Sequence, residues 1–300
     1  MTASVTLGHL DTAGQERFKR LTRPPQYAWP TLIMSGVQIA IMLAAYGYGV
    51  LGQLPLWLGM LINGFGAYLA FSVGHDSIHR AISTNKALND FVGHVGLGIV
   101  MPYVDLRLFR WAHSRHHRFA NAPQDPDYIL HGPWWSLPLR WALIDVLYVI
   151  HAFRYRDKVS RPFLRNSLIR AVMFMAFAAV AIQAGYGMPL LMLWLIPSRI
   201  GLMALGCVFF WLPHVPHDVT QEENFTRATT VRRGYEWLLN PILQYQNYHL
   251  IHHLYPLTPF YNNEKVFRLI EPGLRNCDLA VQHNFAITPQ LYPAGGLRGA

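Results

Sequence analysis

The chain has 300 residues, of which 52% are hydrophobic and only 14% are charged. Soluble domains carry about 25% charged residues, so this composition excludes an ordinary soluble protein. Two cysteines without a C-x-x-C motif exclude a disulfide framework. The net charge of +9 is better explained by membrane topology and anionic lipid headgroups than by nucleic-acid binding.

The chain opens with a polar segment, residues 1–28, which lacks the apolar core of a signal peptide and is expected to be a cytoplasmic tail. Residues 31–72 and 171–197 contain no Asp, Glu, Lys or Arg. Because about 20 apolar residues cross a bilayer as a helix, each stretch is long enough for most of a helical hairpin. The sequence therefore predicts four transmembrane helices, at residues 29–50, 54–74, 167–185 and 188–212.

The positive charges predict how these helices are oriented. Lysines and arginines concentrate before the first helix, between the second and the third, and after the fourth. Positive residues are retained on the cytoplasmic side, so both termini and the central segment should be cytoplasmic. We therefore expect an all-α fold in one membrane-embedded domain, residues 1–300, with two transmembrane hairpins and a cytoplasmic helical cap. Its parts are the tail, the first hairpin at 29–74, a cytoplasmic insert at 75–166, the second hairpin at 167–212 and the cap at 213–300.

Two features of the apolar segments leave alternatives open. Trp134 and Trp135 precede a predicted amphipathic helix at about 138–153, which either lies at the membrane interface or packs into the core. Arg199 stands inside the fourth predicted helix, just after a proline. An ionisable group at this depth is either functional or paired at a break in the helix.

Eight histidines fall into three clusters at the predicted cytoplasmic ends of the helices. They are His75 and His79; His113, His116 and His117; and His249, His252 and His253. On a helix, side chains three or four residues apart share one face, so each cluster can direct its imidazoles at a single point. Neutral imidazole binds zinc, copper, iron and nickel. Eight such ligands are too many for one tetrahedral ion, which predicts two metal ions.

The pattern also restricts the metal. A zinc hydrolase would present H-E-x-x-H, which the sequence lacks, and zinc sites need only three or four protein ligands. Copper stays an alternative. A two-metal site of nitrogen ligands beside lipid favours iron, because iron can activate O2 against the unreactive C–H bonds of an alkyl chain.

The motifs GHDSIH, HSRHH and YHLIHH resemble the three histidine boxes of the integral-membrane fatty acid desaturase and hydroxylase superfamily, over about residues 60–265. The longer stretches RWAHSRHHRFAN, QDPDYILHGPWWSLPLRW, WLPHVPH and QYQNYHLIHHLYPLTPFY resemble the desaturase-type beta-carotene hydroxylases. The resemblance implies a non-haem di-iron centre with O2 as co-substrate, held by the eight clustered histidines. It also implies one further ligand after the fourth helix, either His214 or His217.

Residues around the ligands can orient them. Metal-bound imidazoles usually donate their second N–H to a carboxylate or carbonyl oxygen. The nearby polar residues that could accept it are Asp76, Asp125, Asp127, Asp218 and Asn247. Asp125 and Asp127, on either side of a proline, could equally be helix caps or members of loop salt bridges.

The implied activity needs two electrons from outside the chain. The sequence has no dinucleotide fingerprint, no haem attachment motif and no iron–sulfur cysteine set. A separate electron donor, ferredoxin or a similar carrier with its reductase, is therefore expected. It could dock on basic residues near the second cluster, which solvation and lipid contact explain equally well: Arg107, Arg110, Arg115 and Arg118.

Three functions are compatible with these patterns, and each of them predicts a multi-pass integral membrane protein. The two enzymatic functions also predict a cytoplasmic active site. The leading hypothesis is an O2-dependent hydroxylase of a carotenoid ring or a similar long hydrocarbon. The alternative is an acyl-lipid fatty acid desaturase or fatty-chain hydroxylase with the same iron site and a different substrate tunnel. A metal transporter is a remote alternative, because a transporter should place its ligands at the bilayer midplane.

Overall fold

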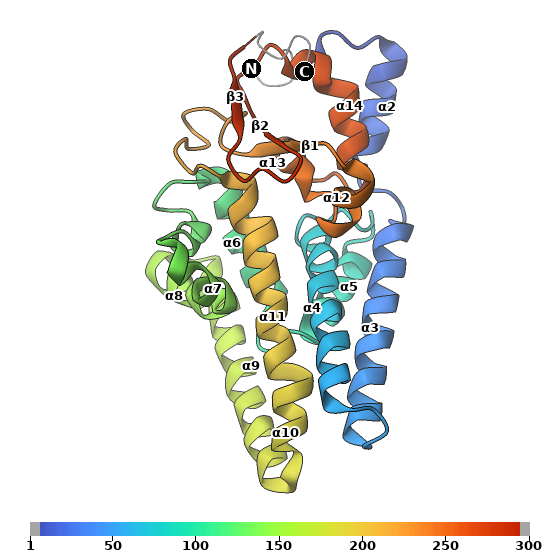
Figure 1. The fold of residues 1–300 in the computed structure, drawn as a ribbon, viewed down its shortest axis with the longest axis vertical. Coiled ribbons are helices and arrows are strands. Elements are labelled where there is room, and N and C mark those ends of the chain that lie inside the picture. Colours follow the sequence, from blue (N-terminus) through green and yellow to red (C-terminus); the bar gives the residue numbers. More distant parts are fainter. Residues whose placement is uncertain (1–6, 295–300) are drawn as a thin grey trace. The chain divides into compact units, whose positions relative to one another are not determined.

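A computed structural model describes residues 7–294 and gives a mostly helical fold with one small sheet (Figure 1). The chain forms two compact units, each built from segments that are far apart in the sequence. Residues 27–114 and 129–207 form what we call the apolar-helix unit. What we call the sheet unit contains the described residues up to 26, together with 115–128 and those from 208 onward.

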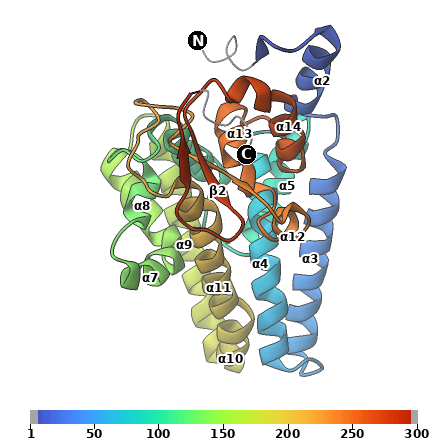
Figure 2. The same cartoon turned by 45° about the horizontal axis from the view of Figure 1, so that its top comes forward.

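The apolar-helix unit contains the long helices that the charge-free stretches predict. Helix α3 (Trp29–Val50) and helix α4 (Leu56–Ile78) lie side by side in both views (Figure 1 and Figure 2). A third helical segment, Ser160–His214, belongs to this unit up to residue 207 and is also long and apolar enough to cross a membrane. These helices fit a membrane protein, while the number of spans and their cytoplasmic orientation stay predictions.

The third segment is not one straight helix. Its parts are α9 (Ser160–Ala181), η3 (Ile182–Tyr186), α10 (Gly187–Leu190), η4 (Leu191–Leu195), α11 (Ile196–Leu205) and η5 (Gly206–Trp211). Gly185 interrupts it with a φ of 90°, a conformation that glycine adopts without steric cost. The rings of Phe174 and Trp194 lie 4.4 Å apart, whereas about 20 residues of straight helix would separate them by about 30 Å. The segment therefore folds back at Gly185, between the third and fourth predicted helices.

Small residues allow the long helices to pack closely. A Cβ atom on Gly66 of α4 would lie 2.4 Å from the side chain of Met42 in α3. A Cβ atom on Gly201 of α11 would lie 2.6 Å from the Cβ atom of Ala67 in α4. Protein interiors are close-packed, so a larger side chain at either position would force the helices apart.

Shorter elements complete the apolar-helix unit. They are α5 (Lys86–Gly98), α6 (Leu106–Phe119), η1 (Pro126–Leu130), η2 (Trp134–Ser136), α7 (Leu137–Ala142) and α8 (Ile144–Tyr155). Two of these, α6 and η1, extend across the boundary between the units along the chain. Trp134 and Trp135 are 83% and 70% exposed, which favours the membrane-interface alternative over core packing for this region.

Arg199 is paired rather than isolated in its helix. Its guanidinium group donates to both carboxylate oxygens of Asp145 in α8, at 2.9 and 2.8 Å. It also donates to the Tyr103 hydroxyl and to the Ala142 carbonyl, each at 2.9 Å. Bidentate pairs of this kind have a fixed geometry, so Arg199 ties α11 to the segment that contains α7 and α8.

The sheet unit consists of short elements around its own apolar core. Its helices are α2 (Thr12–Thr22), η6 (Leu212–His214), α12 (Glu236–Ile242), η7 (Gln246–Tyr248), α13 (His249–Leu254), η8 (Phe260–Asn262) and α14 (Asn263–Leu274). Phe18 of α2, Tyr248, Ile251 of α13 and Ile270 of α14 are buried together in this core. The third histidine cluster therefore begins on a helix that is anchored by large apolar side chains on its other face.

A three-stranded sheet corrects the prediction of an all-α fold. Its strands are β1 (Thr230–Arg233), β2 (Leu279–His283) and β3 (Gln290–Tyr292), in the order β1-β2-β3. Strands β1 and β2 are parallel, with Arg232 opposite Gln282, and β2 and β3 are antiparallel. Strands of three to five residues are too short to give a clear alternation of polar and apolar residues, so the pattern did not reveal them.

Candidate metal centre

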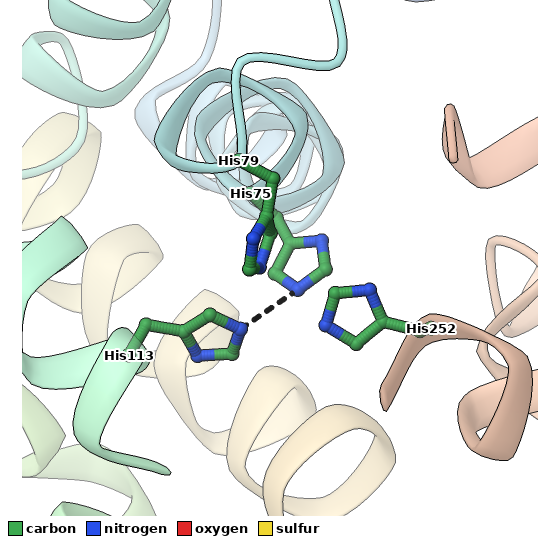
Figure 3. Close-up of side chains that lie close together, drawn as sticks. All are labelled: His75, His79, His113 and His252. Carbon is green, nitrogen blue, oxygen red and sulfur yellow. Dashed lines mark hydrogen bonds between the residues drawn. The ribbon is translucent and has the colours of Figure 1, made fainter. Parts of the chain in front are cut away.

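Three predicted ligands come together in the apolar-helix unit, and we call them group A: His75, His79 and His113. His75 and His79 lie one helical turn apart at the end of α4, and His113 comes from α6 (Figure 3). The Nε2 atoms of His75 and His113 are 3.2 Å apart, and the His79 ring centroid lies 4.8 Å from that of His113. Figure 3 also draws His252, which belongs to the sheet unit.

Hydrogen bonds fasten the two helices that carry group A. Arg110 lies one turn before His113 on α6 and donates to the carbonyl oxygens of Ile78 and Ser77, at 2.9 and 3.2 Å. These carbonyls belong to the last turn of α4, where acceptors have no partner further along the same helix and are satisfied by other groups. Arg110 also pairs with Asp90 at 2.5 Å. The contact fixes the end of α4 against α6 and so brings the three imidazoles together.

Four further histidines converge within the sheet unit, and we call them group B: His116, His214, His249 and His253. All four are buried, with exposures of 1%, 2%, 2% and 7%. The Nε2 atoms of His116 and His253 are 3.1 Å apart, as are those of His214 and His249. One potential ligand atom from each of the four residues lies within 4.8 Å of the others.

The other ring nitrogen of three group B histidines is held by the protein. Nδ1 of His116 lies 3.0 Å from Asp125 Oδ1 and 3.1 Å from Asp127 Oδ2. Nδ1 of His214 donates to the carbonyl oxygen of Ala228 at 3.1 Å, and Nδ1 of His249 donates to Gln246 Oε1 at 2.8 Å. An imidazole that donates through Nδ1 presents the lone pair of Nε2, so these contacts aim three Nε2 atoms into the group.

The surroundings shift the pKa values of two group B histidines in opposite directions. Burial alone would lower the pKa of His116, but the carboxylates of Asp125 and Asp127 outweigh it and raise that pKa to about 9. Burial and the neighbouring imidazoles lower the pKa of His253 well below its ordinary value. Two buried carboxylates thus face one buried ligand, and they compensate part of the positive charge that a cation would bring.

The donor set of both groups fits a transition-metal ion. Bonds from a metal ion to imidazole nitrogen are about 2.1 Å long, which puts neighbouring ligand nitrogens roughly 3 to 3.5 Å apart. The closest pairs of Nε2 atoms, at 3.2 Å in group A and 3.1 Å in group B, lie in this range. Imidazole nitrogen suits iron, copper, zinc and nickel. The residues therefore fit the iron that the histidine boxes imply.

Three other predicted ligands lie in the sheet unit. The rings of His117 and His252 have centroids 4.6 Å apart, and His117 also stacks on His253 at 4.3 Å. His217 has a φ of 66°, and its ring centroid lies 6.5 Å from that of His214. Of the two candidates for the further ligand, the structure brings His214 into group B and leaves His217 outside it, among the residues described.

Of the five residues expected to orient the ligands, two contact a group B histidine in the structure. Asp125 and Asp127 contact His116, as described above, and Asp76 is buried and accepts a hydrogen bond from Thr31 at 2.8 Å. The other two have different partners. Asp218 is exposed and lies 3.7 Å from Arg227, and Asn247 donates to Asn240 at 2.7 Å.

Sequence reasoning missed two residues that hold group B, Gln246 and Ala228. Gln246 lies three residues before His249, and this helical spacing was a usable signal for a contact. Ala228 acts through its backbone carbonyl, for which the side-chain pattern holds no signal. Two of the basic residues near the second cluster, Arg107 and Arg110, are paired with Asp105 and Asp90.

The fold and its ligand groups define a class of protein: a membrane-type helical protein with polyhistidine metal sites. The sequence model of the Fatty acid desaturase family matches residues 51–285. The chain therefore belongs to the fatty acid desaturase family. Members of this family are non-haem di-iron oxidoreductases.

Curated relatives share about a quarter of their residues with this chain. The chloroplastic omega-6 fatty acid desaturase of Brassica napus is 25% identical over 268 residues, which cover 78% of this chain and 58% of the relative. The omega-3 fatty acid desaturase fat-1 of Caenorhabditis elegans is 28% identical over 264 residues, covering 75% and 63%. The sn-1 oleoyl-lipid 12-desaturase of Synechocystis is 26% identical over 261 residues, covering 75% and 72%. The chain thus spans only about three fifths of the first two relatives.

Proposed function

We propose that the protein is an acyl-lipid fatty acid desaturase, a membrane oxidoreductase that uses O2 and two iron ions. The observation that carries this proposal is the convergence of two sets of buried histidines in a chain of the desaturase family. The relatives are named as omega-6, omega-3 and oleoyl-lipid desaturases, which supports our alternative hypothesis over the leading one, a carotenoid hydroxylase. Desaturation of an acyl chain is therefore preferred to ring hydroxylation.

Each group of histidines would hold one iron ion. Group A would bind one, and His252, which belongs to the third histidine box, would be a further ligand of the di-iron centre. Group B would bind the other, with His214 as the further ligand, and His117 would complete the pair of sites. When bound, the iron ions supply O2-dependent removal of hydrogen from an unactivated C–H bond.

The chain's own residues would prepare the site for this chemistry. Burial of six of the seven histidines in the two groups limits access of water to the ligands. Asp125 accepts the Nδ1 proton of His116 and Asp127 lies beside the same nitrogen, which keeps Nε2 directed into group B. The helical anchor at Arg110 keeps His113 in register with His75.

The partners and the location of the site follow from the same proposal. The substrate is a lipid acyl chain in the membrane, and the electrons come from a separate donor, ferredoxin or a similar carrier. Both termini and the active site would face the cytoplasm, in keeping with the distribution of lysine and arginine along the chain. Two membrane hairpins would present the iron site to the lipid.

Expression in a bacterial host rich in monounsaturated lipids, together with ferredoxin and its reductase, tests the substrate class. We expect new diunsaturated acyl chains in gas chromatography–mass spectrometry of fatty acid methyl esters. The His116→Ala variant should give none, and His9→Ala, an exposed histidine outside both groups, should act like the unchanged protein. If a host making beta-carotene accumulated hydroxylated rings while its acyl chains stayed unchanged, the proposal would be wrong and the carotenoid hypothesis right.

A further inference from the structure

Asn121 lies just beyond the end of α6, at a point where the backbone of the sheet unit turns sharply. Its φ is 67°, in the left-handed region, which asparagine adopts more readily than most other non-glycine residues. The side chain is 93% buried, judged from a residue exposure of 7%. A buried polar side chain in this conformation needs partners, and its partners are informative.

Asn121 donates three hydrogen bonds within the sheet unit. Its backbone N–H donates to Asp125 Oδ2 at 3.0 Å. Its side-chain Nδ2 donates to the carbonyl oxygens of Val219 and Ala228, at 2.8 and 2.9 Å. Because both partners of the amide are carbonyl oxygens, the NH2 group must face them, and the orientation of the amide is fixed.

Two of these three acceptors also hold a histidine of group B. The carboxylate of Asp125 lies 3.0 Å from Nδ1 of His116. The carbonyl oxygen of Ala228 accepts from Nδ1 of His214 at 3.1 Å. We propose that Asn121 is a positioning residue that fixes the supports of His116 and His214 together, and so sets the geometry of one iron site. This inference rests on the proposed function, in which both histidines bind the same ion.

The reason lies in what each acceptor would do without Asn121. Without the amide, residue 121 would lose its contacts with Val219 and Ala228. Its backbone N–H would then no longer be held toward Asp125 Oδ2, and the carboxylate could rotate with the His116 ring. The Ala228 carbonyl belongs to the loop before β1, and the amide of Asn121 ties that loop to the end of α6. A single residue thus relates a ligand on α6 to a ligand on η6, although the two are 98 residues apart in the sequence.

Two substitutions remove the amide donor of Asn121 in different ways, and both keep its backbone N–H. Asn121→Asp keeps the size of the side chain but turns a carboxylate toward two carbonyl oxygens, which repel it. Asn121→Gly keeps the backbone donor and tolerates the φ of 67°, while it removes the amide. Asn284→Gly is the matched control, because Asn284 also has a left-handed φ, of 55°, in the same unit and its N–H donates to Arg233.

Titration of Co(II) into the metal-stripped, full-length protein in detergent measures the effect. The unchanged protein and Asn284→Gly should bind two ions with the same affinities. Both Asn121 variants should bind one ion unchanged and the second about 10- to 100-fold more weakly, the usual cost of losing an outer-shell partner. Thermal unfolding of both metal-free glycine variants should stay cooperative, with a lower midpoint for Asn121→Gly because it loses two buried hydrogen bonds.

Two results would overturn the positioning role. One is two unchanged affinities in both Asn121 variants. The other is an equal loss of affinity at both sites in Asn121→Gly, which would mean that Asn121 serves only folding. If the unchanged protein, correctly folded, bound fewer than two ions, the proposed di-iron function would fail, and this inference would fail with it.

Discussion

Replacement of Asp125 by asparagine is expected to weaken metal binding at group B while leaving group A intact. The carboxylate accepts from Nδ1 of His116 at 3.0 Å and from the backbone N–H groups of Asn121 and Asp127, at 3.0 and 2.9 Å. An amide has one acceptor oxygen, so its NH2 group would oppose at least one of these donors. Loss of a hydrogen bond to a charged group costs about 1.5–3 kcal/mol, or about 10- to 150-fold in affinity.

Iron content per chain and competitive Co(II) titration measure this change. The Asp125→Asn protein should retain one tightly bound ion and bind the second at least tenfold more weakly, in line with the loss of a charged partner. Asp218→Asn is the matched control, because Asp218 is exposed and its neighbour is Arg227, at 3.7 Å. If Asp125→Asn bound both ions as tightly as the control, the contact with His116 would have no part in holding the metal.

Three further outcomes are expected. Gly201→Leu should destabilise the protein by about 1–3 kcal/mol through overpacking against α4. Gly36→Leu should not, because the space around Gly36 is open. Thermal unfolding in detergent compares the two variants. Arg110→Gln should reduce iron at group A by unfastening α6 from the end of α4, and an iron content equal to that of the exposed Arg118→Gln control would contradict this. Metal binding at group B should strengthen from about pH 7 to about pH 9. Burial lowers the pKa of His116, but Asp125 and Asp127 outweigh this effect and raise the pKa to about 9. A proton must therefore leave His116 before the metal binds. Calorimetry in buffers of different ionisation enthalpy would detect that proton, and its absence would refute the argument.

The clustering of the histidines could be predicted from the sequence because it is local. His75 and His79 share a helical face in any conformation that keeps α4 intact, and the same holds for His249 and His253 on α13. Helix formation in these segments follows from their apolar runs and from tertiary packing. What the sequence could not provide is the division of the histidines between two groups, because His113 and His116 lie on one helix and belong to different groups.

The surrounding contacts were harder to predict because they depend on backbone turns. We expected Asn247 to orient a histidine, but its neighbour Gln246 does so, and Asn247 donates to Asn240. Tyr245, just before them, has a φ of 60°, which redirects the chain into the short helix η7. A one-residue difference in where that helix begins decides which side chain points at His249. The amino-acid sequence does not define a helix boundary to within one residue.

The same limit explains why the sequence named the metal centre more surely than the substrate. A histidine box specifies ligand spacing on a helix, and that spacing is the same whether an enzyme oxidises an acyl chain or a carotenoid ring. The resemblance of the flanking segments, such as WLPHVPH, pointed to carotenoids, yet in the structure this segment supplies His214 to group B. Enzymes with different substrates share the residues that build the metal site. Sequence similarity in such segments therefore indicates a metal site and does not identify the substrate. Substrate choice must then depend on residues lining the path of the hydrocarbon, which the histidine spacing does not constrain.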